Sequence, residues 1–410
     1  MLPHALKTAI KVLLRRKFFT AASLFGISVT LAVLMIAAAL FDHVFAPRPP
    51  EVYADRTLGI YNTVFTGPDW RRTGTPGYRL LVETARNLPG AERVAFHSTS
   101  SDAVGFIGGE RVTLQLKRTD GEFWRVFRFD FLDGGPFSDD DAAAARFVAV
   151  INESTRRRYF GDAPALGRPI DVGGQRFRVV GVVPDIPLSR VIVSADLWVP
   201  IQTAPTDAYK TQLAGSFLGT IVANSRADFP AIREEFRRRI SEVTFPDRTF
   251  DHIEANAETL FETFAGLVLG PGPGAVEKLV AILAAIALLF MALPTLNLVN
   301  LNISRILERA SEIGVRKAFG ASSRALLGQF LVENVVLTLI GGALGLALAA
   351  IGLEIVNRSG IIPYAELGLN LRIFGYAVAL TVFFGVWSGV YPAWKMSRLR
   401  PIEALNGGAR

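Results

Sequence analysis

The chain has 410 residues, of which 44 are Lys or Arg and 37 are Asp or Glu, and it contains no cysteine. Half of the residues are apolar and a fifth are charged, which is a smaller charged share than the roughly 25% of ordinary soluble domains. The lack of cysteine excludes disulfides and thiolate metal sites. The net charge of +7 is compatible with nucleic-acid binding. The positions of the charges along the chain therefore have to distinguish a nucleic-acid-binding protein from a membrane protein.

Four long apolar runs interrupt the chain, and none of them contains a charged residue. They cover residues 24–41, 279–296, 335–353 and 373–390. Each has about 18 residues or more, the length that crosses a hydrocarbon core of roughly 30 Å. A single central Lys or Arg would cost about 2.5–3.5 kcal/mol on insertion. Buried helices of a soluble protein are the alternative, but such helices usually keep a polar stripe.

Basic residues gather at particular ends of these runs. Residues 1–17 carry five basic residues and no acidic one, segment 304–325 carries five more, and the tail 395–410 is also basic. The positive-inside rule therefore predicts that both termini and 304–325 are cytoplasmic. Segments 46–275 and 354–370 then lie outside. Because topology accounts for much of the positive charge, we expect no nucleic-acid partner.

These patterns predict an α-helical integral membrane protein with four transmembrane helices. A large α+β extracytoplasmic domain is inserted between the first and the second helix. The first run exceeds the apolar core of a signal peptide, which favours an uncleaved anchor. The predicted segments are a helix at 1–17 that is either interfacial or a cytoplasmic extension, transmembrane helices at 18–45, 276–301, 326–353 and 371–394, the external domain at 46–275, a cytoplasmic coupling region at 302–325, a short external loop at 354–370 and a cytoplasmic tail at 395–410.

Local patterns inside 46–275 indicate alternating strands and helices. The apolar run 147–151 reads as a strand, and Asn152 opens a helix that Gly161 ends. Alternating residues on both sides of Gly173-Gly174 predict a hairpin of 169–172 and 177–183. Residues 232–243 form a charged amphipathic helix in this interpretation. The Gly/Pro segment 270–274 breaks any helix, so it is a boundary and a candidate hinge.

Catalytic motifs are missing from the sequence. The four histidines are scattered, there is no GxSxG elbow, and no GxxxxGK[ST] motif could cradle phosphates. The acidic run 139–141 favours a solvated loop over a cation site. We predict no catalytic residue and no metal site, and we expect no ATP hydrolysis by this chain alone.

Polar residues near the ends of the apolar runs, and small residues within them, point to structure rather than to transport chemistry. Glu277, Lys278 and Glu333 lie near the ends of the spans, so no proton relay crosses the bilayer, which argues against a secondary transporter. Gly341 and Gly345 are spaced four residues apart, which is typical of close helix packing in membranes.

The most specific stretch of the sequence is 304–323. Ser311 and Glu312 can cap a short helix there, and Gly314 and Gly320 permit close approach and a turn. A solvated connector would not usually keep Ile313, Val315, Ala318 and Phe319. A rigid segment that is both charged and apolar suits a groove on another protein.

The stretch 312–322, preceded by Glu308-Arg309, resembles the ER..EIG.RRA.GAS signature of FtsX/MacB-type ABC-transporter permeases. Phe319 departs from the Leu usual in that family. The ending YPAWK at 391–395 followed by PIEAL at 401–405 is similar to the family's C-terminal pattern. Residues 150–183 resemble the MacB-type periplasmic core domain. The resemblance covers most of the chain.

The resemblance implies a non-catalytic permease subunit in a bacterial cytoplasmic (inner) membrane. Such permeases pair as homodimers or heterodimers and bind two copies of an ABC ATPase, which binds the ATP and Mg; this chain would bind no cofactor itself. ATP hydrolysis by the partner would drive conformational work by this chain on a substrate outside the membrane. That work would serve the efflux of peptide- or antibiotic-like compounds or the handling of lipoproteins. Membrane lipid surrounds the spans, and a periplasmic adaptor or a cell-wall hydrolase is a further partner. The alternative is an FtsX-like regulator of an extracytoplasmic cell-wall hydrolase that transports nothing.

The same resemblance assigns a coupling helix to the cytoplasmic region. The residues expected to dock on the ATPase are Glu312, Ile313, Gly314, Val315, Arg316, Lys317, Gly320 and Ala321. The family often runs a helical stalk straight into its second span. Here segment 270–274 interrupts that path, which favours a flexible joint at this point.

Overall fold

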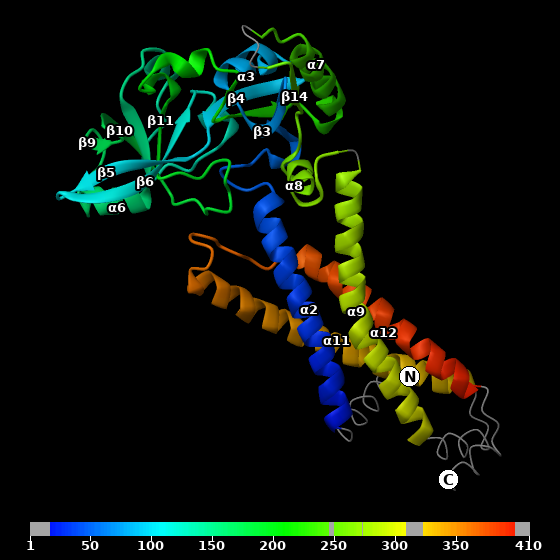
Figure 1. Cartoon of the computed structure of the whole chain (residues 1–410). Helices are drawn as coiled ribbons and strands as arrows, with labels where there is room; N and C mark the ends of the chain where they lie inside the picture. The colour runs from blue at the N-terminus through cyan, green and yellow to red at the C-terminus, as the bar shows by residue number, and fades with distance from the viewer. Residues whose placement is uncertain (1–16, 246–249, 273, 309–322, 398–410) are drawn as a thin grey trace. The chain divides into compact units, whose positions relative to one another are not determined.

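The computed structural model describes residues 17–245, 250–272, 274–308 and 323–397 (Figure 1). The chain divides into two compact units. The membrane unit comprises Met1–His43, Val280–Ile361 and Glu366–Arg410, and the α+β domain comprises Val44–Leu279 with Ile362–Ala365. Each unit is described by itself.

A ten-stranded sheet forms the framework of the α+β domain. Its order is β1-β13-β4-β6-β11-β8-β10-β9-β5, with β7 added beside β10. The strands are β1 (Thr57–Ile60), β4 (Ala91–Ser98), β5 (Ser101–Ile107), β6 (Glu110–Thr119), β7 (Asp133–Gly134), β8 (Val148–Asn152), β9 (Pro169–Val172), β10 (Gln175–Val183), β11 (Leu197–Pro200) and β13 (Phe217–Ala223).

Part of this sheet closes on itself. Strand β5 pairs with β6 as well as with β9, so β6, β11, β8, β10, β9 and β5 form a ring. One buried cluster takes apolar side chains from every strand of this ring, including Ile151, Phe177 and Val199. Side chains fill the interior of small barrels in the same way. The ring is therefore a packed core without a channel.

The other end of the sheet is covered by a second layer. A four-stranded sheet of order β12-β3-β2-β14 lies there, with β2 (Thr63–Gly67), β3 (Trp70–Pro76), β12 (Ala214–Gly215) and β14 (His252–Ala255). Helices α3 (Tyr78–Ala85) and α7 (Phe229–Ser241) lie at the same end of the domain as β14 (Figure 1). Ile232, Phe236 and Ile240 face the core because they repeat every four residues along α7.

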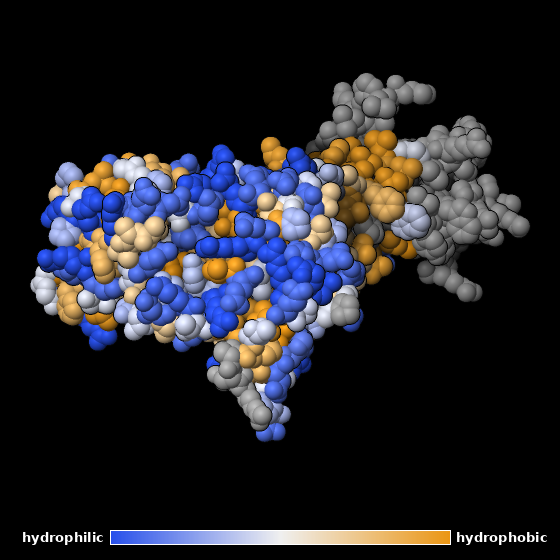
Figure 2. Space-filling model, turned by 90° about the horizontal axis from the view of Figure 1, so that it is seen from above, coloured by the Kyte–Doolittle hydropathy of each residue, from blue (hydrophilic) through white to orange (hydrophobic). Residues whose placement is uncertain are grey.

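Short helices and an aromatic cluster complete the domain. The short helices are η1 (Ala54–Arg56), α4 (Phe123–Val126), α5 (Asp139–Ala143), α6 (Glu153–Phe160), η2 (Ile201–Thr203), η3 (Asp207–Lys210), η4 (Arg226–Asp228) and α8 (Leu260–Leu269). Phe123, Trp124, Phe137 and Trp198 pack in a cluster between α4 and the sheet. The face of the domain seen in Figure 2 is mainly hydrophilic, as expected for a domain in water.

The structure confirms several local predictions. Strand β8 and helix α6 occupy the predicted positions, and the Asn152 side chain caps α6 by accepting from the Thr155 N–H at 2.9 Å. Strands β9 and β10 pair as the predicted hairpin. Gly173 and Gly174 have φ of 61° and 74°, the left-handed conformation that a tight hairpin turn requires. The predicted helix at 232–243 is α7, which begins and ends slightly earlier.

The prediction of a solvated loop at 139–141 is wrong. Asp139, Asp140 and Asp141 form the first turn of α5. The Ser138 hydroxyl accepts from the Asp141 N–H, and the Asp141 carboxylate accepts from the Ser138 N–H in return. This reciprocal capping starts the helix, and carboxylates are favourable at a helix N-terminus. The three acids are therefore helix-starting residues.

The membrane unit is made of long helices. They are α2 (Lys17–Phe45), α9 (Ala275–Glu308), α11 (Ser323–Ser359) and α12 (Leu371–Ser397). Three described segments are long and apolar enough to cross a membrane: Thr20–Phe45, Ala275–Ala292 and Leu331–Ser359. The apolar stretch of α12 within the described residues, Leu371–Trp387, is shorter, so the fourth span stays a prediction.

The helical path into the second candidate span is interrupted, as the Gly/Pro segment predicts. Helix α8 ends at Gly270, whose φ of 90° lies outside the helical region, and α9 begins at Ala275. Gly274 has a φ of 80°. α8 and α9 are therefore two separate helices.

Candidate functional site

The predicted ATPase-coupling residues Glu312, Ile313, Gly314, Val315, Arg316, Lys317, Gly320 and Ala321 lie outside the described residues. The same holds for residues 1–16 of the predicted N-terminal helix. Helix α9 ends at Glu308 and α11 begins at Ser323, so the coupling segment joins these two helices along the chain. Its role stays a prediction.

The predicted packing glycines lie against helix α2. A Cβ atom at Gly341 would come within 2.7 Å of Ile27, and one at Gly345 within 2.9 Å of the Leu31 Cβ and 3.0 Å of the Ser28 carbonyl oxygen. These separations are shorter than normal carbon contacts. Only glycine allows the backbones of α11 and α2 to approach this closely.

The acidic residues near the span ends differ in their surroundings. Glu277 and the neighbouring Lys278 are exposed in the first turn of α9. Glu333 is buried near the start of the candidate span in α11, next to the buried Asn334. Ionisable residues in such positions face the interior of a helix bundle.

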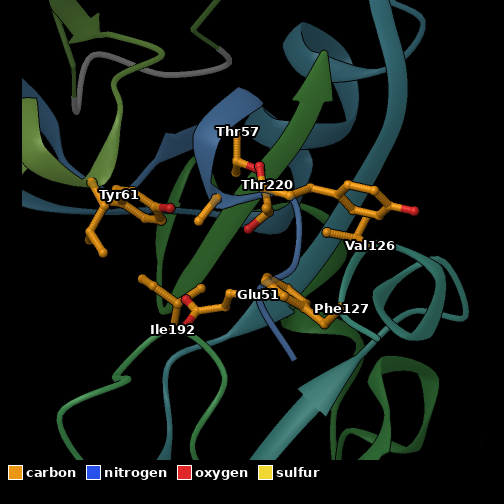
Figure 3. Close-up of a pocket in the computed structure, with 10 residues that line it drawn as sticks. Glu51, Thr57, Tyr61, Val126, Phe127, Ile192 and Thr220 are labelled. Atoms are coloured by element: carbon orange, nitrogen blue, oxygen red, sulfur yellow. The ribbon is translucent and has the colours of Figure 1, made fainter. Parts of the chain in front are cut away.

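A small cavity lies in the α+β domain, and no pattern in the sequence predicts it. Figure 3 shows Glu51, Tyr61 and Thr220 among the side chains that surround it. Its volume is about 30 Å³, which suits one or two water molecules and no larger compound. The lining residues are Glu51, Tyr53, Ala54, Thr57, Tyr61, Val126, Phe127, Ile192, Thr220 and Leu260.

Buried charges lie beside this cavity. The Arg190 guanidinium donates to the Glu51 carboxylate at 2.6 Å, and their side chains are only 4% and 12% exposed. The Lys117 side chain is fully buried, and its Nζ donates to the Ile192 carbonyl at 2.8 Å and to the Ser98 carbonyl at 3.4 Å. We name Glu51, Lys117 and Arg190 the buried charge cluster.

Burial shifts the pKa values in and around this cluster. Desolvation lowers the pKa of Lys117 to about 7, and the charge of Glu51 opposes that shift. Desolvation raises the pKa of Glu51, and Arg190 opposes it. Burial, together with the charge of Lys117, lowers the pKa of His97 well below its usual value. His97 is therefore a neutral ring that exchanges a hydrogen bond with Thr220 at 3.0 Å.

The buried charge cluster attaches the segment that follows α2 to the body of the domain. Glu51 lies six residues after the end of α2, whereas Lys117 is on β6 and Arg190 precedes β11. Separating a buried ion pair leaves a charge in a medium of low polarity. The chain leaving α2 is thereby attached to the sheet of the α+β domain.

Helix α8 is attached to the domain by a second ion pair. Arg233 of α7 donates to the Glu262 carboxylate at 2.5 Å and to the Ala257 carbonyl at 3.0 Å. Glu262 also accepts from the Thr259 N–H and so caps the helix it belongs to. Within the described ranges, no group of three His, Asp or Glu residues is arranged to hold a metal ion.

Two protein families match this chain. Residues 20–239, more than half of the chain, match the MacB-like periplasmic core domain. Residues 284–401 match the FtsX-like permease C-terminal family. The two matches follow one another along the chain and include the long helices as well as the sheet.

Curated relatives match nearly the whole chain. It is 27% identical over 416 residues to the macrolide export ATP-binding/permease protein MacB of Chromobacterium violaceum, covering 98% of this chain and 61% of that protein. It is also 27% identical over 417 residues to the pyoverdine export ATP-binding/permease protein PvdT of Pseudomonas fluorescens, covering 98% and 59%. The chain thus spans about three fifths of the length of these relatives.

Solved structures match about half of the chain. The periplasmic region of MacB from Actinobacillus actinomycetemcomitans is 16% identical, with a TM-score of 0.37, and the match covers 53% of this chain and 95% of that one. Together the two family matches cover residues 20–239 and 284–401 of this sequence. The chain belongs to the MacB/FtsX-type ABC-transporter permeases, which carry a MacB-like periplasmic core domain and an FtsX-like permease C-terminal region.

Proposed function

We propose that this chain is the membrane subunit of an ABC export complex and that it transmits work from ATP hydrolysis to a substrate outside the cytoplasmic membrane. The family match and the names of the relatives as export ATP-binding/permease proteins support this proposal. The sequence contains no GxxxxGK[ST] motif. In this proposal ATP and Mg bind to a partner ATPase.

The proposed topology has four spans in a bacterial inner membrane. Three candidate spans and the long helix α12 support it, together with the distribution of basic residues. In this arrangement both termini and the 302–325 region are cytoplasmic. The α+β domain then lies on the outer side, where the exported compound is handled.

The observation that carries the mechanical part of the proposal is the attachment of Glu51 to Arg190. Helix α2 runs without a break to Phe45, and Glu51 follows shortly after it. A movement of α2 is therefore passed to the sheet through the buried charge cluster. The second connection runs through segment 270–274, which separates α8 from α9 and makes a less rigid arm.

The proposed complex contains two ATPase chains and two permeases, paired as a homodimer or a heterodimer. Glu312 to Ala321 dock on the ATPase in this proposal, with Arg316 and Lys317 supplying positive charge. The substrates are peptide- or antibiotic-like compounds or lipoproteins, and a periplasmic adaptor completes the export route. The names of the relatives favour export over regulation of a cell-wall hydrolase.

Charge reversal in the coupling segment tests the proposal. We expect the double variant R316E/K317E to insert normally in the membrane but to lose most of its co-purifying ATPase, because it reverses the two positive charges that the proposal places at the contact with the ATPase. The measurement is the ratio of ATPase to permease after affinity purification from membranes.

The matched control is R157E/R158E, which reverses two adjacent, exposed arginines of α6 in the α+β domain. It should retain the ATPase at the level of the unmodified chain. Undiminished ATPase recovery with R316E/K317E would refute the assignment of the coupling segment.

A further inference from the structure

Helix α8 carries an apolar face that the α+β domain does not cover. Its sequence, LFETFAGLVL, has a single charged residue. Leu267 is 81% exposed and Val268 is 52% exposed, and Phe264 lies one turn before them on the same face. Ala265, on another side of the helix, is fully buried. The helix therefore packs against the domain along one side and is exposed along the other.

The length of α8 limits what this face can meet. It has 10 residues, whereas a membrane-spanning helix needs about 20. An apolar segment of this size is typical of a core helix or of a helix that lies in the membrane interface. The exposure of Leu267 and Val268 excludes a core helix.

The chain connections keep α8 near the ends of two candidate spans. The Phe45 ring, at the end of the candidate span Thr20–Phe45, meets the rings of Phe261 and Phe264 with centroids 5.4 Å and 5.6 Å apart. At its other end, α8 is separated from the candidate span that begins at Ala275 by segment 270–274 alone. Even fully extended, that segment reaches at most about 18 Å.

We propose that α8 is an interfacial helix, with Phe264, Leu267 and Val268 immersed in the outer boundary between lipid head groups and acyl chains. Both ends of the helix are held beside points where the chain crosses the membrane surface. The occupant of the apolar face is therefore lipid. Glu262 points away from the lipid because it pairs with Arg233 of α7. The helix rests on the membrane and holds the domain beside it, whether or not an ATPase is bound.

The absence of cysteine from the sequence allows a direct test with single spin labels. The variants L267C and V268C are labelled in the full-length chain and reconstituted in lipid nanodiscs. Collision rates with oxygen, which concentrates in lipid, are compared with those of a water-soluble nickel chelate. D207C, on the exposed side chain of η3, is the reference for water, and I351C, on α11, is the reference for the membrane interior.

We expect oxygen to relax the labels at 267 and 268 more than the nickel chelate does. The label at 351 should behave in the same way, and the label at 207 should show the opposite preference. Higher accessibility to nickel at both positions would place the helix in water and overturn the proposal. Low accessibility to both reagents, or dipolar broadening between labels, would show that protein or a second copy covers the face, and would also overturn it.

Discussion

Lys117 has an environment that lysine side chains rarely occupy. Its strand β6 is covered on both faces at this point, so a residue at the polar position of an alternating pattern is buried. Its ammonium is compensated by backbone carbonyls and by the charge of Glu51. The sequence pattern cannot reveal such a site, since Glu51 and Arg190 are far apart along the chain and their pairing depends on the whole sheet.

Removing one partner of the buried pair should weaken the domain strongly. We expect R190M to lower the free energy of unfolding by about 3–5 kcal/mol, because the Glu51 carboxylate is left buried without its counter-charge. Urea unfolding of the detergent-solubilised chain, followed by tryptophan fluorescence, to which the buried Trp124 and Trp198 contribute, measures the loss.

The control for this prediction is R157M. Arg157 is an exposed partner of Glu153, which also pairs with Arg156. R157M should therefore lower the free energy of unfolding by no more than about 1 kcal/mol. Equal losses for R190M and R157M would show that the attachment at Glu51 does not stabilise the domain.

The buried Lys117 should make stability depend on pH. Burial lowers the pKa of Lys117 from 10.5 to about 7. Between these values the unfolded chain keeps a proton that the folded chain has released. Stability therefore rises with pH in this window, by at most about 1.4 kcal/mol per pH unit from this group.

The comparison that isolates this effect is the unmodified chain against K117M between pH 7 and pH 10. Burial raises the pKa of Glu51 and lowers the pKa of His97, and both groups are present in the two proteins, so the comparison isolates the substituted lysine. We expect the difference in stability between the two proteins to change with pH. A constant difference would mean that Lys117 keeps its ordinary pKa.

At the scale of single elements, the sequence predicts structure where the cause is local. The hairpin of β9 and β10 follows from two glycines in a turn, and α6 follows from its Asn152 cap. Helix α5 also has a local cause, the reciprocal capping of Ser138 and Asp141. That spacing is present in the sequence, but the prediction for 139–141 weighs only a solvated loop against a cation site.

The contact between α11 and α2 is another element-scale feature, and it rests on small residues. We expect G345A to destabilise the membrane unit by about 1–3 kcal/mol, since the added Cβ would overlap with Leu31 and with the Ser28 carbonyl. The shift of the thermal unfolding midpoint in detergent measures this loss.

G375A is the corresponding control. Gly375 lies on α12, and a Cβ added there meets no described atom within 4 Å. The thermal unfolding midpoint of G375A should stay unchanged or rise slightly, because alanine has a higher helix propensity than glycine. If G345A behaves like G375A, the helices are not held by close backbone approach.

At the scale of the whole molecule, the amino-acid sequence predicts the order of the membrane and α+β segments. It does not predict that six strands of the sheet close into a ring. Apolar runs and basic residues suffice to predict a membrane part and an inserted α+β part. The six-strand ring depends on β5 pairing with both β6 and β9. Such long-range pairs have no signal in a single sequence, and the same holds for the junction of Glu51 with Arg190.

The two connections between the membrane helices and the α+β domain differ in their local structure. The first passes from α2 into the buried charge cluster, and the second passes through the Gly/Pro segment 270–274. We infer that the first arm drives the domain and that the second arm accommodates the motion. Motion of the α+β domain relative to the membrane helices, driven by the nucleotide state of the ATPase, is the central claim of the proposed mechanism.

The most direct measurement of this claim is the distance between spin labels at D207C and R358C, one in each unit, in the complex with its ATPase. Labelled chains are diluted with unlabelled ones, and the distance distribution is recorded without nucleotide and with ATP and vanadate. We predict that trapping shifts the distribution in the intact complex and leaves it unchanged with R316E/K317E. An identical distribution with and without trapped nucleotide, in a complex that hydrolyses ATP, would contradict the account.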